Sequence, residues 1–241
     1  MSVLVLDILQ YFPSINPTIL QILLCKLGFS PLLCNLINSY YSTHSTRYLW
    51  NVFHSKDYDT NNGIPQGDPL SPILSVLYMS SIINKLFPYT RDNSPMCLSY
   101  IDDYVLMVDS PSLAANIESL EAAYSNISDA FCKVSLRIEP SKTELCHFAR
   151  KDQLPPRGRK PIRFDCLFSS LPSITLRSTH HPLIVIAPTK EWRYLGFYFD
   201  PFLSFSHHIN RYANKSLVVA QNLCVTIFPY FYKFTQVLSA Q

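Results

Sequence analysis

Glycine is scarce in this sequence: only 5 of its 241 residues are glycine. So small a share excludes a collagen-like chain and a glycine-rich linker array, and no internal repeat is visible. Charged residues make up 15% of the chain and hydrophobic residues 48%. A chain with this balance can fill a hydrophobic core, so the composition excludes an intrinsically disordered protein.

The sequence also has little excess charge of either sign. Its 20 Lys and Arg residues against 17 Asp and Glu residues leave a formal net charge of +3. A nucleic acid would therefore have to be bound by a local basic patch rather than by the charge of the whole protein. The proline-rich segment 150–163 is one such patch, because it holds 6 of the 20 basic residues.

Cysteine pairs and targeting segments are missing as well. The 7 cysteines include no CxxC pair and no Cys–His cluster at zinc spacing, which favours reduced core thiols over disulfides. Asp7 interrupts the apolar start of the chain, which argues against a signal peptide. The apolar run 70–87 carries several serines and Pro72, which favour a buried helix over a membrane span. We expect an intracellular protein, nuclear or cytoplasmic, with no membrane contact.

The pattern of apolar residues predicts an irregular alternation of helices and strands. Three- and four-residue spacings, first-turn prolines and terminal glycines predict helices at 17–27, 31–42, about 69–87, about 112–132 and from about 206. Short apolar, β-branched and aromatic runs predict strands at 2–8, 46–54, 143–149, 183–187 and 193–199, and two more within 96–108. This order indicates an α+β fold around one sheet.

Two adjacent aspartates, Asp102 and Asp103, interrupt the apolar stretch 96–108. Like charges in a half-buried turn repel, so a cation is expected to neutralise them, although an ordinary hairpin turn also favours aspartate. Asp7 ends the apolar first strand. If that strand pairs with the hairpin, Asp7 and Asp102 face one another across the sheet. Converging carboxylates suit Mg²⁺, and two such ions support in-line displacement at phosphorus.

The segment GIPQGDPLSPIL, residues 63–74, predicts a loop that leads into a helix. Gly63 and Gly67 relieve backbone crowding at a place where a ligand could approach closely. Gln66 offers a neutral donor and acceptor between them. The alternative interpretation is a capped helix after a loop, because Asp68 and the following prolines suit a first helical turn.

Together these segments resemble the palm motifs of reverse transcriptases, in the order usual for that family. The resemblance covers residues 2 to about 215, and its last part is most similar to non-LTR, LINE-type retrotransposon enzymes. It implies a polymerase palm, that is, a ferredoxin-like or RRM-like antiparallel sheet backed by helices, with a partial helical thumb. The matching motifs are Asp7 with Phe12, GIPQGDPLSP (63–72), YIDD (100–103), KTELCHF (142–148) and WRYLGFYFD (192–200).

The resemblance implies a role for each candidate catalytic residue. Asp7, Asp102 and Asp103 would hold two Mg²⁺ ions, with Mn²⁺ as an alternative. Lys142 matches the lysine that protonates the leaving pyrophosphate; the alternative is an ordinary surface lysine. Phe12 matches the ring that excludes a 2′-hydroxyl and so selects dNTPs; the alternative is a core aromatic.

The resemblance also implies which residues bind the substrates. One group would line the dNTP pocket beside the triphosphate. A second group would bind the primer and template, with a hairpin that grips the primer end. The basic segment would contact template–primer phosphates. The alternative is that this segment is only a solvated loop. The implied dNTP-binding residues are Ile8, Phe12, Gln66 and Gly67; the implied primer- or template-binding residues are Tyr100, Tyr194, Leu195, Gly196, Arg157, Arg159 and Lys160.

We therefore expect an RNA-directed DNA polymerase that uses an RNA template, a DNA primer and dNTPs. Because a fingers region precedes the first catalytic aspartate in the family, we expect a fragment of a longer polyprotein with fingers and an endonuclease. The alternatives are an inactive retrotransposon remnant that keeps the palm fold and binds nucleic acid, and a maturase or RNA-directed RNA polymerase relative. The expected parts are a palm (1–149), a basic loop (150–163), a β-hairpin and primer-grip-like region (164–205) and the start of a thumb helix (206–241).

Overall fold

The computed structural model describes residues 1–42, 45–59, 63–88, 94–148, 171–179 and 181–238, with side chains described up to residue 223. Contacts within the chain divide it into two units. The first unit holds the described residues up to His147 together with 171–189, and the second holds Phe148 and the residues from Lys190 onward. The segment 171–189, which the sequence groups with the primer-grip-like region, thus has its contacts in the first unit, and the four expected boundaries stay predictions.

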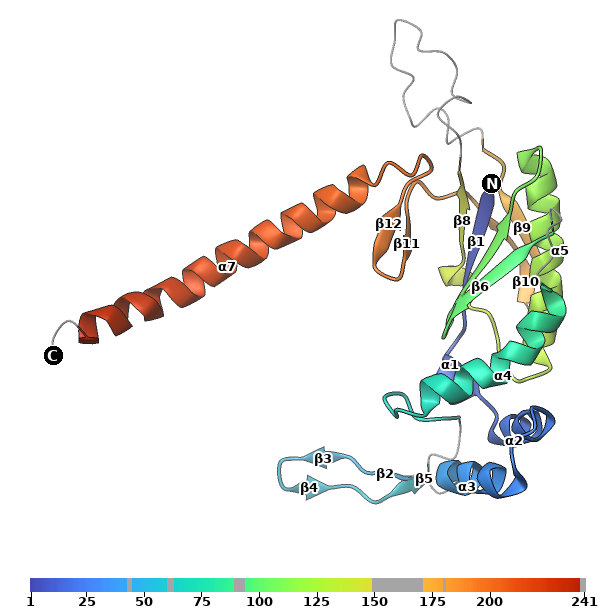
Figure 1. The fold of residues 1–241 in the computed structure, drawn as a ribbon, viewed down its shortest axis with the longest axis horizontal. Coiled ribbons are helices and arrows are strands. Elements are labelled where there is room, and N and C mark those ends of the chain that lie inside the picture. The colour runs from blue at the N-terminus through green and yellow to red at the C-terminus, as the bar shows by residue number, and fades with distance from the viewer. Residues whose placement is uncertain (43–44, 60–62, 89–93, 149–170, 180, 239–241) are drawn as a thin grey trace, which may run out of the picture. The chain divides into compact units, whose positions relative to one another are not determined.

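The first unit is built around β1 (Ser2–Asp7), an inner strand of a four-stranded antiparallel sheet (Figure 1). β7 (Asp103–Val108) pairs with β1 on one side, and β8 (Glu144–His147) pairs with it on the other. β6 (Met96–Tyr100) forms the outer edge next to β7. The strands predicted for these four segments are confirmed, and with them the α+β class.

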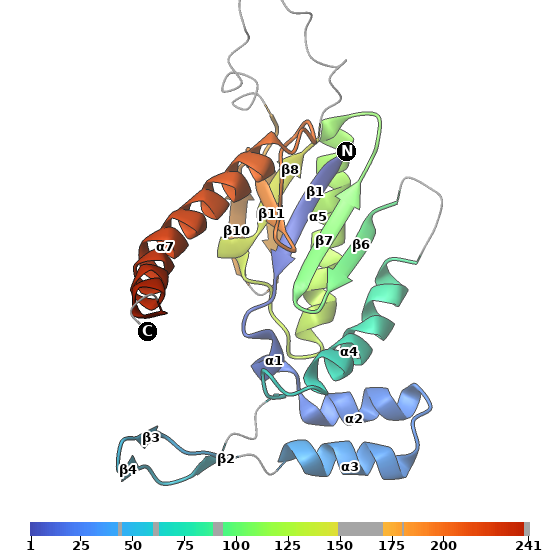
Figure 2. The ribbon, with the colours of Figure 1, turned by 60° about the vertical axis from the view of Figure 1, so that its left-hand side comes forward.

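One face of this sheet is covered by the long helix α5 (Leu113–Cys132) (Figure 2). Successive residues of a strand point to opposite faces, so Leu4 and Leu6 of β1 lie on the same face as Tyr104 of β7. The ring of Tyr104 contacts that of Phe131 from α5, with centroids 5.2 Å apart. All four side chains are almost fully buried, so this face forms the core and Asp7 lies on the other face.

A second hairpin, formed by β9 (Ile174–Ser178) and β10 (His181–Ile186), also packs against α5 and is followed by a segment that bonds to β8. Three polar contacts join this hairpin to the helix. Glu121 accepts the backbone N–H of Thr175 at 2.8 Å, Ser128 and Ser178 share a hydrogen bond of 2.8 Å, and the Tyr124 hydroxyl bonds His181 Nε2 at 2.6 Å. α5 therefore packs against both the sheet and this hairpin, and of the two hairpin strands only β10 is predicted from the sequence.

The other helices predicted for the first unit begin within two residues of their predicted starts, and two short helical elements that are not predicted occur as well. The side-chain oxygen of Asn16 caps the first long helix by accepting the N–H groups of Thr18 and Ile19 at 3.0 and 3.1 Å. Pro17 follows this cap in the first turn, where its missing N–H removes no helical bond. These elements are α1 (Tyr11–Ser14), α2 (Pro17–Lys26), α3 (Pro31–Ser42), α4 (Ser71–Leu86) and the 3₁₀ turn η1 (Pro140–Lys142).

The prediction of a single strand over 46–54 is wrong. The chain reverses at Asn51, whose φ of +52° lies in the left-handed region that asparagine tolerates better than most residues. The result is a narrow ribbon with exposed aromatic side chains, in which two pairs of short strands follow one another. These strands are β2 (Ser45–Thr46), β3 (Leu49–Trp50), β4 (Phe53–His54) and β5 (Tyr58–Asp59).

The second unit consists of a β-hairpin followed by the helix α7 (Ser206–Leu238). The hairpin strands are β11 (Trp192–Tyr194) and β12 (Phe197–Phe199), so the strand expected over 193–199 from the apolar pattern is wrong, and the chain forms a hairpin there, as the family resemblance implies. Leu195 and Gly196 have φ values of +47° and +87°, the left-handed pair that a tight two-residue hairpin turn needs. The helix predicted from about residue 206 is confirmed.

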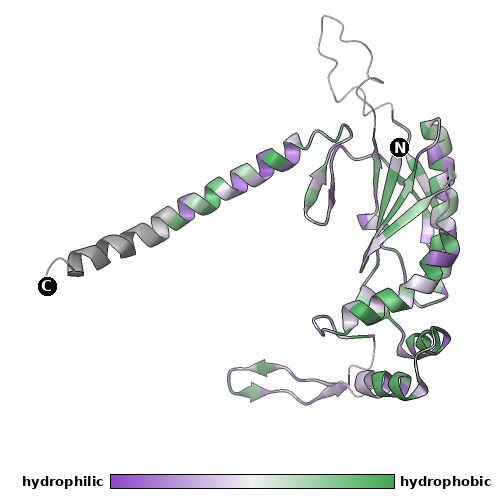
Figure 3. Cartoon of the chain, in the orientation of Figure 1, coloured by the Kyte–Doolittle hydropathy of each residue, from purple (hydrophilic) through white to green (hydrophobic). Residues whose placement is uncertain are grey.

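Apolar residues gather in the sheet of the first unit, whose strands are mostly green in Figure 3. None of the helices in the described segments is both long and apolar enough to cross a membrane. The expectation of unpaired thiols is confirmed for the five described cysteines outside α7, which are all free.

Gly63, the first residue of the predicted glycine loop, lies against the backbone that leaves β1. Its neighbour Ile64 donates its N–H to the carbonyl oxygen of Phe12 at 3.0 Å. A Cβ at Gly63 would lie 2.4 Å from that oxygen and 2.4 Å from Cα of Pro13, and φ is +72°. Because both neighbours are backbone atoms, they cannot move aside as a flexible side chain would.

Gly63→Ala is therefore expected to destabilise the first unit by about 2–5 kcal/mol, the sum of left-handed strain and overpacking. Gly28→Ala is the matched control, because Gly28 has a φ of +88° but nothing within 4 Å of its added Cβ. It should cost only the strain, about 1–2 kcal/mol. Urea unfolding measures the free energy of unfolding of both variants. If the two variants lose the same amount, the close backbone approach at Gly63 does not contribute to stability.

Candidate active site

The carboxylates meet where β1 ends. In the antiparallel register Asp7 lies directly opposite Asp103, and both side chains lie on the face away from α5. Asp102 occupies the two-residue turn between β6 and β7, one position beyond this pair. The sequence expectation set Asp7 opposite Asp102; the register partner is Asp103, because the two-residue turn consists of Ile101 and Asp102.

The turn that holds Asp102 has an unusual backbone. Its first residue, Ile101, has a φ of +56°. This left-handed conformation is strained for a β-branched side chain and costs on the order of 1–3 kcal/mol. The surrounding sheet holds the strained turn in place, and such strain is common where a backbone positions functional groups.

The three aspartates repel one another. The pKa of Asp103 is raised from its ordinary value, first by burial and then by the negative charges of Asp102 and Asp7. Burial also raises the pKa of Tyr11, and the negative charge of Asp102 adds to this increase. The end of β1 is therefore a place with an excess of negative charge, which a cation would relieve.

One cation already lies there. Lys142, at the end of η1, donates from Nζ to Oδ2 of Asp7 at 2.9 Å. This hydrogen bond and the charge of Asp7 raise the pKa of the lysine ammonium. The structure thus joins Lys142 and Asp7, which are 135 residues apart in the chain and which the sequence analysis selects separately.

The donor atoms of this site fit a divalent metal ion of the Mg²⁺ class. Within the described segments, no three His, Cys, Asp or Glu side chains are grouped so as to hold an ion together. Mg²⁺ does not need three, because it is usually held by one or two carboxylates with substrate phosphates and waters completing its shell. Asp7 with one carboxylate of the Asp102–Asp103 pair meets that requirement in ligand type.

The glycine loop is held at both of its ends next to the segment that follows β1. Phe12 accepts the N–H of Ile64, and the hydroxyl of Ser71 donates to the carbonyl of Pro65 at 2.6 Å. Between these anchors Gln66 and Gly67 are exposed. The structure therefore brings Phe12 close to the loop and leaves the two candidate dNTP-binding residues open to a ligand.

A third anchor of the loop comes from α3. The buried Tyr41 donates its hydroxyl hydrogen to Oδ2 of Asp68 at 2.9 Å, while Oδ1 of Asp68 accepts the N–H of Leu70 at 3.0 Å. Burial, with Asp68 contributing, raises the pKa of Tyr41 to about 12. No motif in the sequence singles out Tyr41, because a tyrosine on the apolar side of a helix also describes an ordinary core residue.

The remaining candidates of the first unit lie near the same strand ends. The buried Ile8 forms a bridge with Ile138, so its backbone is held between two chain segments. Tyr100 is exposed at the end of β6, where it is the register partner of Asp103. Arg157, Arg159 and Lys160 lie outside the described residues.

Of the candidate primer-gripping residues, Tyr194 ends β11, and Leu195 and Gly196 form the turn between β11 and β12 of the second unit. The hydroxyl of Tyr212, from α7, donates to the carbonyl of Gly196 at 3.0 Å. Trp192 stacks on Phe199 across the hairpin, with ring centroids 5.1 Å apart. The helix and the hairpin therefore support the turn from both sides.

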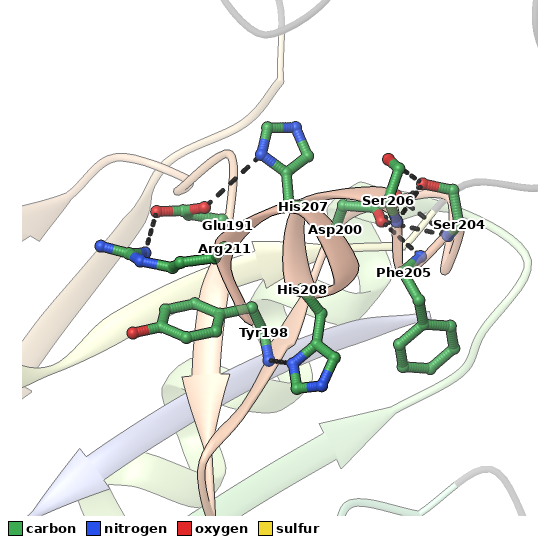
Figure 4. A network of polar contacts seen from close by, with 9 residues as sticks. All are labelled: Glu191, Tyr198, Asp200, Ser204, Phe205, Ser206, His207, His208 and Arg211. Atoms are coloured by element: carbon green, nitrogen blue, oxygen red, sulfur yellow. Dashed lines mark hydrogen bonds and ion pairs between the residues drawn. The ribbon is translucent and has the colours of Figure 1, made fainter. Parts of the chain in front are cut away.

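A polar network joins the end of this hairpin to the start of α7 (Figure 4). The carboxylate of Asp200 accepts the N–H groups of Ser204 and Phe205 at 3.0 and 3.1 Å and the Ser204 hydroxyl at 2.8 Å. Burial alone would raise the pKa of Asp200, but these hydrogen bonds outweigh it and hold the pKa below its ordinary value. Glu191 pairs with Arg211 of α7 at 3.3 Å.

An antiparallel sheet backed by a helix, with carboxylates at the end of its paired inner strands, has the architecture of a polymerase palm. The sequence profile of one family, described as reverse transcriptase (RNA-dependent DNA polymerase), matches residues 1–199. This match covers most of the chain, and the chain belongs to the reverse transcriptase family. Polymerases of this family generally use divalent metal ions.

Solved structures with the same fold include telomerases. The apo telomerase of Candida tropicalis matches with a TM-score of 0.50 and 11% identity, covering 85% of this chain and 32% of that chain. The C. tropicalis telomerase in complex with a TWJ fragment of telomeric RNA matches with a TM-score of 0.47 and 12% identity, covering 70% and 32%. This chain therefore spans about a third of those proteins. A comparison with curated sequences finds no match.

Asp103→Asn tests the repulsion among the aspartates. Because folding raises the pKa of Asp103, the folded state binds its proton more readily than the unfolded chain, so the linked stability falls as the pH rises above the ordinary aspartate pKa. We expect the variant to be more stable than the wild type at neutral pH, by up to about 1 kcal/mol at this partly exposed site. The difference should vanish at a pH of about 3, where both side chains are neutral.

Urea unfolding at the two pH values measures this effect. Asp59→Asn, on the exposed ribbon of the first unit, is the control for a general loss of negative charge and should leave the stability unchanged. If Asp103→Asn is no more stable than the wild type at neutral pH, the three carboxylates do not repel one another in the way the geometry indicates.

Proposed function

We propose that this chain carries the palm and the start of the thumb of an RNA-directed DNA polymerase of the LINE type, which adds dNTPs to the 3′-hydroxyl of a DNA primer. Membership of the reverse transcriptase family supports this function in general. The observation that carries it is the register of β1 and β7, which sets Asp7 against Asp103 with Asp102 in the adjoining turn.

Asp7 and the Asp102–Asp103 pair are the proposed ligands of two Mg²⁺ ions, with Mn²⁺ as an alternative. When bound, these ions supply activation of the primer 3′-oxygen and charge neutralisation at the leaving pyrophosphate. The protein contributes a fixed backbone for its ligands, because Asp7 and Asp103 lie on paired strands and Asp102 in a turn of defined geometry. Excess negative charge at this place favours binding of a cation.

The dNTP is proposed to lie between the end of β1 and the glycine loop. Phe12 is half-buried, with its ring centroid 5.4 Å from that of the buried Tyr11, and its carbonyl holds the loop through Ile64. The backbone of Phe12 is therefore fixed beside the loop, and its ring is placed to exclude a 2′-hydroxyl by contact. The exposed Gln66 and Gly67 then form the floor of the pocket.

The proton for the leaving pyrophosphate is proposed to come from Lys142. Its ammonium group contacts Asp7 and is otherwise exposed to solvent, so it can also reach a phosphate at this site. The primer and the RNA template are proposed to contact Tyr100, the turn 194–196 and the basic residues Arg157, Arg159 and Lys160. A telomeric RNA fragment bound by one telomerase of this fold is compatible with an RNA template here.

Primer extension tests the function. With an RNA template, a DNA primer, dNTPs and Mg²⁺, the wild-type chain expressed together with its upstream coding region should extend the primer, and Asp102→Ala should reduce the rate by at least about 100-fold, as expected when a metal ligand is lost. Asp59→Asn is the control on the exposed ribbon and should extend normally. Synthesis that survives Asp102→Ala would reject the metal assignment, and no extension by the wild type would favour an inactive remnant.

Phe12→Val tests the selection of the sugar. A smaller side chain leaves room for a 2′-hydroxyl, so the ratio of rNTP to dNTP incorporation should rise by about 10- to 100-fold, the range for steric discrimination by one side chain. Phe29→Val is the matched control, because Phe29 is also a half-buried phenylalanine packed on the core but lies beyond α2. An unchanged ratio in the Phe12 variant would assign this ring to the core alone.

A further inference from the structure

The turn that carries Lys142 is held against the end of β1 by backbone hydrogen bonds. The N–H of Glu139 donates to the carbonyl of Asp7 at 2.8 Å, and the N–H of Leu9 donates to the carbonyl of Arg137 at 2.9 Å. The turn itself is closed by the N–H of Lys142, which donates to the carbonyl of Glu139 at 3.2 Å. The fold therefore brings the base of this lysine side chain to Asp7 independently of side-chain contacts.

The ammonium group is surrounded mainly by negative charge. Its hydrogen bond with Asp7 raises its pKa most strongly, and the charges of Glu139 and Asp102 add to the effect. Glu139 is itself oriented by the hydroxyl of Ser141, which donates to Oε1 at 2.7 Å. The side chain of Lys142 is 64% exposed and that of Asp7 25%, so the lysine has room to move while the aspartate does not.

A metal ion and this ammonium group compete for the same oxygen. Mg²⁺ binds a carboxylate oxygen at 2.0–2.1 Å and holds its other ligands in a near-ideal octahedron. Nζ of Lys142 now occupies Oδ2 of Asp7 at 2.9 Å. Two cations sharing one oxygen would lie within about 5 Å of each other, where like charges repel.

We propose that Lys142 is the built-in counter-ion of Asp7, and that it leaves Oδ2 when a divalent cation binds there. This inference rests on the proposed function, because it takes Asp7 to be a metal ligand. The released ammonium group stays on the turn beside Glu139, three residues earlier, and is then free for the leaving pyrophosphate. Lys142 therefore weakens metal binding in the free protein and becomes available as a proton donor once the metal is bound.

Binding of Mn²⁺ alone, without nucleotide or nucleic acid, tests the exchange. Free Mn²⁺ is measured by electron paramagnetic resonance during titration of the full chain. Lys142→Gln removes the competing charge and should bind Mn²⁺ about three- to five-fold more tightly, the range expected for an exposed ion pair. Lys142→Arg keeps the charge and should bind no more tightly than the wild type. Lys26→Gln, at the exposed end of α2, controls for overall charge and should not change the affinity.

The outcomes separate this inference from the proposed function. If Asp7→Asn abolishes binding while Lys142→Gln binds like the wild type, the carboxylate site stands and the exchange is wrong. Weaker binding by Lys142→Gln would show that the lysine supports the metal site, which also overturns the exchange. If Asp7→Asn and Asp102→Asn both bind Mn²⁺ like the wild type, the metal site of the proposed function fails, and the exchange fails with it.

Discussion

The register between β1 and β7 is the constraint on which the rest of the candidate site depends. Leu4 and Leu6 must face α5 to be buried, and alternation along the strand then leaves Asp7 on the other face, opposite Asp103. A shift of β1 by one residue against β7 would turn both leucines toward solvent and Asp7 into the core, away from Asp103. Burial of the core therefore selects the one pairing that also brings the carboxylates together.

That pairing has a cost, because three aspartates share one end of the sheet. The raised pKa of Asp103 reflects burial and repulsion together, and the strained Ile101 adds backbone strain at the same turn. At the other end of β1, Ser2, His147 and Asn116 form a buried network in which each polar group has a partner. The contrast shows that the fold pairs the polar groups at one end of β1 but gathers three carboxylates around one lysine at the other.

The sequence predicts what depends on local chemistry and misses what depends on distant contacts. The helix expected at about 112–132 is found at Leu113–Cys132, because its apolar spacing repeats over five turns. The ribbon around Asn51 is missed, since one left-handed residue breaks a strand-like run. The bond from Tyr41 to Asp68 leaves no pattern in the sequence, because it joins a helix to a loop across the fold.

Main-chain bonds at the two ends of one short segment explain how these distant parts meet. At Asp7 the carbonyl receives the N–H of Glu139 and so fixes the turn of Lys142; at Phe12 the carbonyl receives the N–H of Ile64 and so fixes the glycine loop. Such bonds do not depend on which side chains the residues carry, apart from the glycine that the close approach requires. A framework of this kind can keep its geometry while most side chains differ, which agrees with a shared fold at 11% identity. The catalytic side chains proposed here, such as Asp7 and Lys142, then lie on backbone segments whose positions are fixed by the core and by these main-chain bonds.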